Sequence, residues 1–379
     1  MKLPIYLDCN AATPVDDRVF EAMRPYFTEI FGNAASTGHA FGAQARDAVN
    51  DSRRTIAEAL NVSPEEIVFT SGATESDNLA IKGIARLHKG GHIITAATEH
   101  KAVLDPCRCL AQDGYRVTCL PVDRQGFIDL DALSAAFSPD TILVSIMHGN
   151  NEIGTVQDVA AIGALCRARG VPFHTDATQT IGKLPFDAQA LHVDMASLTA
   201  HKMYGPKGAG ALYVRKDCKV APVIDGGGHE RGLRSGTLNV PGIVGLAKSL
   251  EVAVSQMDRD IAHTRALRDR IWEALRAVSP SVIVNGPDPI ADRERRLPNN
   301  LHVSILGFES DAIAAALCQV AVSSRSACTS GSSEPSHVLK AIGSPTDGVF
   351  SLRFGVGRCT SAADIDYVVN QLQSTVTRA

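Results

Sequence analysis

Long apolar runs are missing from this 379-residue sequence, although 45% of its residues are hydrophobic. No stretch approaches the roughly 18 apolar residues that a membrane-spanning helix needs, and the apolar part of residues 1–8 is too short for a secretory signal peptide. An excess of one charge sign is also missing, since the net charge is -4. The composition therefore predicts a soluble cytoplasmic protein that binds neither nucleic acid nor membrane.

Paired cysteine spacing is missing as well. The nine cysteines form an odd number without a disulfide-like pattern, as expected of a protein from a reducing compartment. Cys107 and Cys109 stand two apart, but no second cysteine or histidine pair follows at the spacing of a zinc site. We therefore expect neither a disulfide framework nor a metal site.

The first two thirds of the chain contain short apolar runs that alternate with amphipathic stretches. Helical patterns at residues 76–88 and 160–169 stand between several of these runs. This alternation predicts right-handed crossovers and a largely parallel sheet with helices on both faces, and functional groups should lie at the strand ends. The expected strands are residues 67–70, 92–96, 142–147, 171–175, 193–198 and 209–214.

The pattern changes after residue 240. Residues 240–276 form a long, highly charged helical segment, and a polar, proline-rich stretch follows at 286–300. A chain of this length can form two domains. We expect a large domain over residues 15–258 and a smaller α/β domain made of residues 1–14 and 259–379.

The most informative residue is Lys202, in the segment His201-Lys-Met-Tyr-Gly-Pro-Lys-Gly208 after an apolar run. Asp176 closes another apolar run, in His174-Thr-Asp-Ala-Thr-Gln179. A lysine can bind pyridoxal phosphate covalently, and a carboxylate can keep the cofactor's pyridine nitrogen protonated so that the ring accepts electrons. An isolated lysine is more often a solvated surface residue, but the neighbouring Asp, Gln, His and Gly favour a cofactor site.

The segment Thr70-Ser-Gly-Ala-Thr-Glu-Ser-Asp77 follows one expected strand and opens a helix. Amides at a helix N-terminus, together with a glycine and hydroxyl groups, suit a cofactor phosphate. The same residues would also make an ordinary capped helix start. A dinucleotide site is disfavoured, because the Gly-x-Gly-x-x-Gly pattern is absent from this turn.

Three more segments carry polar groups after strands or in glycine-rich loops. His100 could stack on a flat ring and move protons near neutral pH, or it could be a hydrogen-bonded structural histidine. Asn151 could contact the phenolic oxygen of the cofactor. The loop at residues 226–237 carries arginine and hydroxyl side chains, and it is either a second phosphate contact or a surface loop.

Cys328 lies among small polar residues, in the segment 323–333, close to Arg325. Intracellular cysteines are often small buried hydrophobic residues. An exposed thiol beside a cation, however, is deprotonated more easily and becomes nucleophilic. A flexible loop would also let this thiol move, as active-site loops do.

Taken together, these segments resemble the cysteine desulfurases of the IscS/NifS type, which are class V members of the aminotransferase-like superfamily of fold type I. The resemblance covers residues 6–354 and implies a mainly parallel seven-stranded sheet in the large domain and a smaller C-terminal α/β domain. Seven motifs in the family's order carry it: Ala-Thr-Glu-Ser-Asp-Asn78, Glu99-His100, Asn-Asn151-Glu-Ile-Gly, Asp176-x-x-Gln179, His201-Lys202, Arg234-Ser-Gly-Thr237 and Ser-Ala-Cys328-Thr-Ser.

The resemblance implies a role for each matched residue. Lys202 would carry pyridoxal 5'-phosphate, Asp176 would pair with its pyridine nitrogen, and His100 would stack on its ring and transfer protons. Arg353 would bind the carboxylate of L-cysteine, helped by Asn33 and Asn151. Cys328 would take the sulfur. Further cofactor contacts would come from Gly72, Ala73, Thr74, Asn151, Gln179, Thr199 and His201, and from Thr237 of the partner subunit in a homodimer.

The implied function is a cysteine desulfurase, which converts L-cysteine to L-alanine and holds the sulfur on Cys328 as a persulfide. The sulfur would go to an acceptor protein for iron–sulfur cluster assembly, nitrogenase maturation, tRNA thiolation or DNA sulfur modification. A selenocysteine lyase or an aminotransferase on the same fold is the alternative. A non-catalytic sulfur-relay or scaffold protein is a further alternative, and the intact Lys202, Asp176, His100 and Arg353 argue against it.

Two features depart from the family pattern. Arg325 stands where the family usually has glycine, and we expect its charge to favour the Cys328 thiolate. The sequence ends at Ala379, whereas housekeeping members carry a longer C-terminal tail that docks the iron–sulfur scaffold. A narrower sulfur-delivery pathway is therefore one expectation.

Overall fold

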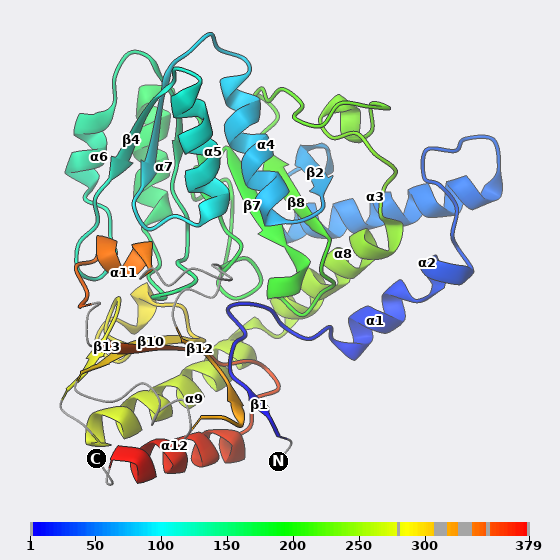
Figure 1. The fold of residues 1–379 in the computed structure, drawn as a ribbon. Coiled ribbons are helices and arrows are strands. Elements are labelled where there is room, and N and C mark those ends of the chain that lie inside the picture. The colour runs from blue at the N-terminus through cyan, green and yellow to red at the C-terminus, as the bar shows by residue number, and fades with distance from the viewer. Residues whose placement is uncertain (1–2, 279–280, 307–316, 325–335, 346–348, 377–379) are drawn as a thin grey trace.

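The computed structural model describes residues 3–278, 281–306, 317–324, 336–345 and 349–376. Figure 1 shows a large sheet flanked by helices, with a smaller sheet and two helices below it. The N-terminal segment begins beside the smaller sheet and then crosses to the larger part. None of the described helices is long and apolar enough to cross a membrane.

The large sheet has seven strands in the order β2-β8-β7-β6-β5-β3-β4. β8 runs antiparallel to both of its neighbours, and the other neighbouring strands pair in parallel. The mainly parallel seven-stranded sheet is therefore confirmed. Its strands are β2 (Ile67–Thr70), β3 (His92–Ala96), β4 (Arg116–Leu120), β5 (Thr141–Ser145), β6 (Phe173–Asp176), β7 (Met195–Thr199) and β8 (Gly210–Val214).

All six expected strands are present, with ends that differ by at most two residues from the expected ones. The sequence analysis missed β4. This strand lies at the edge of the sheet, and most of its side chains are exposed or only partly buried. Its sequence therefore lacks the continuous apolar run that marks a strand covered on both faces.

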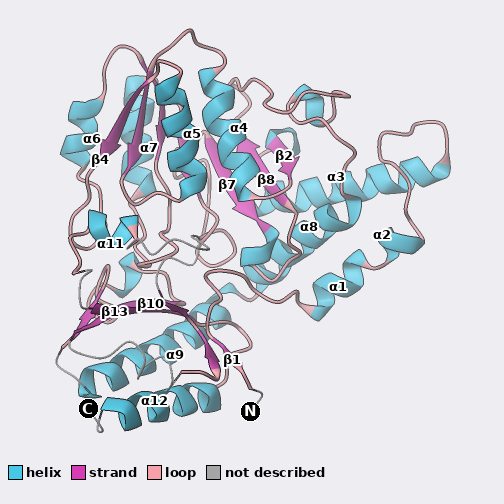
Figure 2. Cartoon of the chain, in the orientation of Figure 1, coloured by secondary structure: helices cyan, strands magenta, loops and turns pink. Residues whose placement is uncertain are grey.

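Helices cover both faces of this sheet (Figure 2). Successive strand residues point to opposite faces, so Ile93 packs with α4 and α5 while Ile94 packs in the core that contains residues of α3, α7 and α8. The helices are α3 (Ala40–Leu60), α4 (Ala73–Ala85), α5 (Lys101–Gln112), α6 (Leu130–Ala136), α7 (Val159–Arg169) and α8 (Val240–Ser255).

The expected helical segment at residues 240–276 consists of two helices rather than one. α8 ends at Ser255, and α9 (Met257–Val278) follows after Gln256. Leu246 and Leu250 of α8 belong to the core of the large sheet, whereas Ile271 of α9 belongs to a second core. The break lets the chain leave one core and enter the other.

The smaller sheet has four antiparallel strands in the order β12-β13-β10-β9, and α9 and α12 (Ala362–Val376) lie beside each other below it (Figure 1). Ile5 and Leu7 from the N-terminus belong to the core of this part. The domain boundaries themselves stay a prediction. The strands are β9 (Val282–Val284), β10 (Asn300–Leu306), β12 (Ser323–Ser324) and β13 (Val349–Gly355), and β1 (Ile5–Tyr6) pairs with β11 (Val320–Ala321).

The remaining described helices are short. α1 (Asp17–Met23) and α2 (Pro25–Thr28) follow the N-terminal segment and lead into the turn before α3. α11 (His337–Ala341) follows residues 325–335 and lies above the smaller sheet (Figure 1).

Candidate active site

A cavity of about 490 Å³ lies at the carboxyl ends of the parallel strands β2, β3, β5, β6 and β7. This is the edge of a parallel sheet at which ligands bind, because the connecting loops of neighbouring strands meet there. The cavity is lined by many of the expected site residues: Gly72, Ala73, Thr74, His100, Asn151, Asp176, Gln179, Thr199, His201, Lys202 and Arg353.

Two of the expected site residues that the structure describes are not among those that line the cavity. Asn33 lies in the exposed turn between α2 and α3, where its Oδ1 accepts a hydrogen bond from the Ala35 N–H at 2.9 Å. Thr237 is exposed in the segment before α8. Cys328 lies outside the described residues, as does Arg325.

The amine of Lys202 lies against the N-terminal segment. Its Nζ donates hydrogen bonds to the carbonyl oxygens of Asn10 and Ala11, both at 2.7 Å. The backbone is held to the same segment, since the N–H and the hydroxyl of Thr13 both donate to the carbonyl of His201. Sequence reasoning missed this contribution because main-chain carbonyls leave no residue-type signal.

A second amine is connected to Lys202 through side chains. Lys183 donates from Nζ to Oε1 of Gln179 at 3.0 Å, and Gln179 donates from Nε2 to the Asn10 carbonyl at 2.9 Å. Burial, and after it the charge of Lys202, lowers the pKa of Lys183 to about 7. The Asn10 carbonyl therefore accepts from both Lys202 and Gln179, and sequence reasoning missed Lys183 as well.

Asp176 ends β6 and faces the cavity, with its Oδ1 accepting from the Thr178 N–H at 2.9 Å. Behind it, burial lowers the pKa of His174 to about 4. Asp77 lies 3.6 Å from His174, and its pKa is raised well above the usual range, first by burial and then by the charge of Asp176. Burial therefore favours the neutral forms of both groups behind Asp176, and the Asp176 side chain itself lies at the cavity wall.

The N-terminus of α4 opens into the cavity without a capping side chain. Gly72 is the N-cap residue, its φ is 151°, and it offers no side-chain hydrogen bond to the helix amides. The hydroxyl of Thr199 lies 3.0 Å from Nδ1 of His201, and both residues line the same space as Thr74. Burial lowers the pKa of His201 to about 4. Helix amides and hydroxyl groups arranged in this way suit an anion.

His100 caps α5 with its ring. Nδ1 accepts a hydrogen bond from the Ala102 N–H at 3.1 Å. A neutral imidazole with this acceptor carries its proton on Nε2. The ring can therefore offer an Nε2–H to a group bound in the cavity.

Arg353 reaches the cavity from β13 and is 2% exposed. Its Nη2 donates to Oδ1 of Asp8 at 2.8 Å and to the hydroxyl of Ser323 at 2.9 Å, and Nη1 donates to the Asn151 carbonyl at 3.2 Å. Its Nε has no hydrogen-bond partner among the described residues. The guanidinium is thus held firmly and can still donate to a bound carboxylate.

The segment that carries Cys328 joins the described structure at two places near the cavity. On its N-terminal side, Ser323 is hydrogen-bonded to Arg353. On its C-terminal side, Ser336 donates to Oε2 of Glu152 at 2.5 Å, and His337 lies with Nε2 at 2.9 Å from the Glu99 carbonyl. Glu99 and Glu152 directly adjoin the cavity residues His100 and Asn151.

Three comparisons with known proteins agree with this architecture. The Aminotransferase class-V family model matches residues 5–368. The cysteine desulfurase IscS of Anaeromyxobacter dehalogenans (strain 2CP-C) is 52% identical over 374 residues, which cover 97% of this chain and 91% of the relative. A solved NifS-like protein superposes with a TM-score of 0.91 at 37% identity and covers 99% of this chain and 100% of its own. The structure of SspA in complex with cysteine superposes with a TM-score of 0.81 at 37% identity, and it covers 93% of this chain and 99% of its own.

Proposed function

The chain belongs to the class-V aminotransferase family and, within it, to the cysteine desulfurases, and from this membership we propose that its cavity binds pyridoxal 5'-phosphate and L-cysteine. The observation that carries the proposal is that Lys202, Asp176 and the uncapped N-terminus of α4 line one cavity. An amine, a carboxylate and an anion site are the three groups that this cofactor needs.

The residues present fit the cofactor. Its phosphate would bind at the N-terminus of α4, to the amides of Gly72, Ala73 and Thr74 and to Thr199 and His201. Asp176 would pair with the pyridine nitrogen, Asn151 and Gln179 would contact the phenolic oxygen, and Lys202 would bind it covalently. The bound cofactor supplies a ring that accepts negative charge from the α-carbon of the substrate.

The chain's own groups then bind the substrate and move its protons. Arg353 would hold the carboxylate of L-cysteine, because a guanidinium matches a carboxylate in shape and charge. The amine of Lys202, once substrate has taken its place, would remove the α-proton. The His100 ring, once it has taken up a proton, would pass it on within the same cavity.

Cys328 would accept the sulfur. Its thiolate attacks the sulfur of bound cysteine, an S–S bond forms, and the C–S bond breaks with its electron pair left on carbon, which takes up a proton to give alanine. The sulfur is then held as a persulfide for transfer to an acceptor protein. The contacts of Ser323 with Arg353 and of His337 with Glu99 support this role, because they bring both flanks of residues 325–335 to the cavity.

We also propose a homodimer in the cytoplasm. Four phenylalanine side chains on α1, on α2, in the loop after α2 and at the start of α3 are between 49% and 65% exposed: Phe20, Phe27, Phe31 and Phe41. Four large apolar side chains exposed in one region of the chain are typical of a protein–protein interface, and we propose that a second copy of this chain covers them. Asn33 stands between Phe31 and Phe41 in the sequence and would therefore lie at the subunit interface. For Thr237, the same location is what the family resemblance implies. The free thiols of all eight described cysteines support a reducing compartment.

The test is to mix the purified protein, loaded with pyridoxal phosphate, with L-cysteine and to quantify alanine and sulfide with and without added thiol. We expect thiol-stimulated sulfide in equal amount to alanine. This sulfide should be lost in Cys328→Ala and kept in Cys109→Ala, which removes an exposed cysteine on α5. Conversion of the cofactor to its amine form without sulfur release would instead indicate an aminotransferase. Strong preference for L-selenocysteine in competition would indicate a selenocysteine lyase.

A further inference from the structure

Tyr204, two residues after Lys202, has a left-handed backbone conformation with a φ of 65°. This region is unfavourable for residues other than glycine, because Cβ approaches the following carbonyl oxygen. A strained residue of this kind persists only where its surroundings hold it, and such residues cluster at functional sites. The contacts that hold Tyr204 are therefore of interest for the position of Lys202.

The backbone of Tyr204 is bound to the N-terminal segment. Its N–H donates to the hydroxyl of Thr13 at 2.8 Å, and its carbonyl accepts from the Asp16 N–H at 2.9 Å. The carbonyls of Asn10 and Ala11, which accept from the Lys202 amine, belong to the same segment. Both the amine of Lys202 and the turn after it therefore depend on where residues 10–16 lie.

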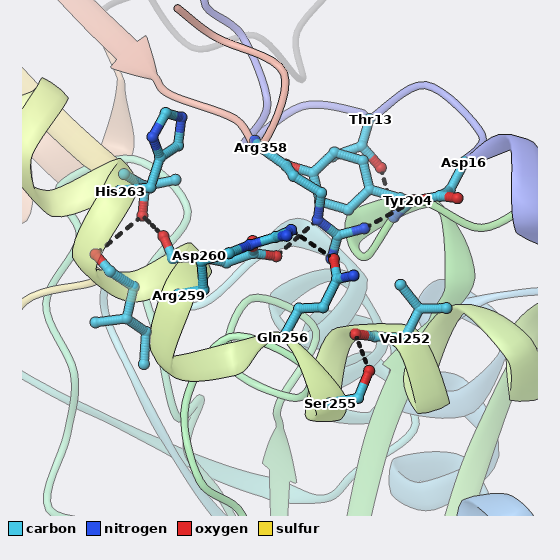
Figure 3. Close-up of polar contacts among 12 residues, drawn as sticks. Thr13, Asp16, Tyr204, Val252, Ser255, Gln256, Arg259, Asp260, His263 and Arg358 are labelled. Carbon is cyan, nitrogen blue, oxygen red and sulfur yellow. Dashed lines mark hydrogen bonds and ion pairs between the residues drawn. The ribbon is translucent and has the colours of Figure 1, made fainter.

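Arg358, from the C-terminal part of the chain, contacts both Tyr204 and the N-terminal segment (Figure 3). Its backbone N–H donates to the Tyr204 hydroxyl at 2.6 Å, and its guanidinium carbon lies 4.3 Å from the centre of the Tyr204 ring. The guanidinium also donates to Asp16 from Nη1 at 3.0 Å and to Asp260 from Nε at 2.7 Å. Asp260 is on α9, so Arg358 joins α9, the N-terminal segment and the turn after Lys202.

We propose that Arg358 is a positioning residue, which holds Tyr204 in its left-handed conformation and thereby fixes where the Lys202 amine lies in the cavity. The inference rests on the proposed function, because it assumes that Lys202 is the cofactor lysine. Arg358 itself does not line the cavity. It acts through Tyr204 and through its ion pair with Asp16 in the N-terminal segment 10–16.

The first test compares Arg358→Gln with the parent protein. We expect kcat to fall about tenfold with KM within about twofold, because the substrate site stays intact while the amine is misplaced. In cofactor-free protein, hydrogen exchange at the amides of residues 203–205 should become about tenfold faster, with β10 unchanged. The matched control is Arg265→Gln, which breaks an ion pair between α9 and Glu294 at 3.0 Å and does not touch this turn.

The second test is a rescue. Glycine adopts a φ of 65° without strain, so Tyr204→Gly should restore most of the kcat that Arg358→Gln loses. If Arg358 only stabilises the fold, the kcat losses of Arg358→Gln and Tyr204→Gly should add in the double variant instead. Tyr204→Phe keeps the ring and removes the hydroxyl, and it should give a smaller loss of kcat than Arg358→Gln.

The inference is overturned if Arg358→Gln leaves both kcat and the exchange of residues 203–205 unchanged, or if Tyr204→Gly gives no rescue. A parent protein without desulfuration would overturn the proposed function instead. The exchange measurement on cofactor-free protein would still decide whether Arg358 holds the turn.

Discussion

Arg353 donates from Nη2 to Oδ1 of Asp8 at 2.8 Å, so a carboxylate from the N-terminal segment lies against the guanidinium that we propose for substrate binding. Ser323 donates to the same oxygen at 2.8 Å and also accepts from Arg353. Asp8 therefore orients the guanidinium and at the same time competes with the substrate carboxylate for its charge.

This competition predicts a decrease in KM for L-cysteine on Asp8→Asn. The amide keeps a hydrogen-bond acceptor but removes the charge, and a neutral hydrogen bond is weaker than a charged one by about 1 kcal/mol, or about fivefold in affinity. Asp8→Ala removes the acceptor as well and should raise KM. Steady-state kinetics with Asp17→Asn as an exposed-carboxylate control measures both. Equal increases of KM in the two Asp8 variants would contradict the prediction.

The buried ion pair between Arg53 and Glu230 predicts a large stability effect. Glu230 accepts from Arg53 at 2.7 and 2.8 Å and from the Phe69 N–H at 2.8 Å, and both charged side chains are largely buried. Glu230→Gln would leave a buried guanidinium without its counter-charge and should lower the free energy of unfolding by about 3 kcal/mol.

Urea unfolding followed by circular dichroism measures this change. The matched control is Glu21→Gln, which removes one partner of an exposed ion pair with Arg24, and its effect should stay within about 0.5 kcal/mol. If the two substitutions lower the free energy of unfolding by the same amount, the buried Arg53–Glu230 pair stabilises the fold no more than an exposed pair does.

His302 predicts part of the acid sensitivity of the protein. Burial, followed by the charges of Arg353 and Arg296, lowers its pKa to about 3, whereas a histidine in an unfolded chain has a pKa of about 6.5. The unfolded state therefore binds one more proton between these values, and the free energy of unfolding falls as pH drops from about 6.5 toward about 3.

His302→Gln removes the titrating imidazole. The slope of the free energy of unfolding against pH should therefore decrease by up to about 1.4 kcal/mol per pH unit between about pH 5.5 and about pH 4. Urea titrations across this range measure the slope. Other buried histidines contribute equally in both proteins, and His88→Gln removes an exposed imidazole as a control. The prediction fails if both substitutions leave the slope of the parent.

The exposed phenylalanines predict the effect of surface substitutions on assembly. A buried phenylalanine side chain contributes roughly 1.5–3 kcal/mol, so the double substitution Phe27→Ser and Phe31→Ser should weaken the dimer at least about a hundredfold. Sedimentation velocity at micromolar concentration should then show monomers. Leu87→Ser removes an apolar side chain that is 47% exposed elsewhere, and it should leave the dimer intact. A dimer in all three proteins would place the interface on another face.

The sheet and the strand-end positions of Lys202, Asp176 and His100 were predictable because their signals are local. Buried parallel strands are short apolar runs, and the polar residues that follow them must meet at one edge of the sheet. The motif resemblance added the roles of residues such as Arg353, which lies far along the chain on the smaller sheet. The edge strand β4 and the break at Gln256 lacked such a signal, since exposure and tertiary packing decide them.

The sequence by itself thus determined the fold class, the family and most of the residues that line the cavity. Only the tertiary structure decided which groups hold those residues. The carbonyls of Asn10 and Ala11 come to Lys202 across more than 190 residues, and Arg358 comes to Tyr204 across 154. Main-chain acceptors carry no side-chain identity, and hydrogen bonds between distant segments follow from packing rather than from any local pattern.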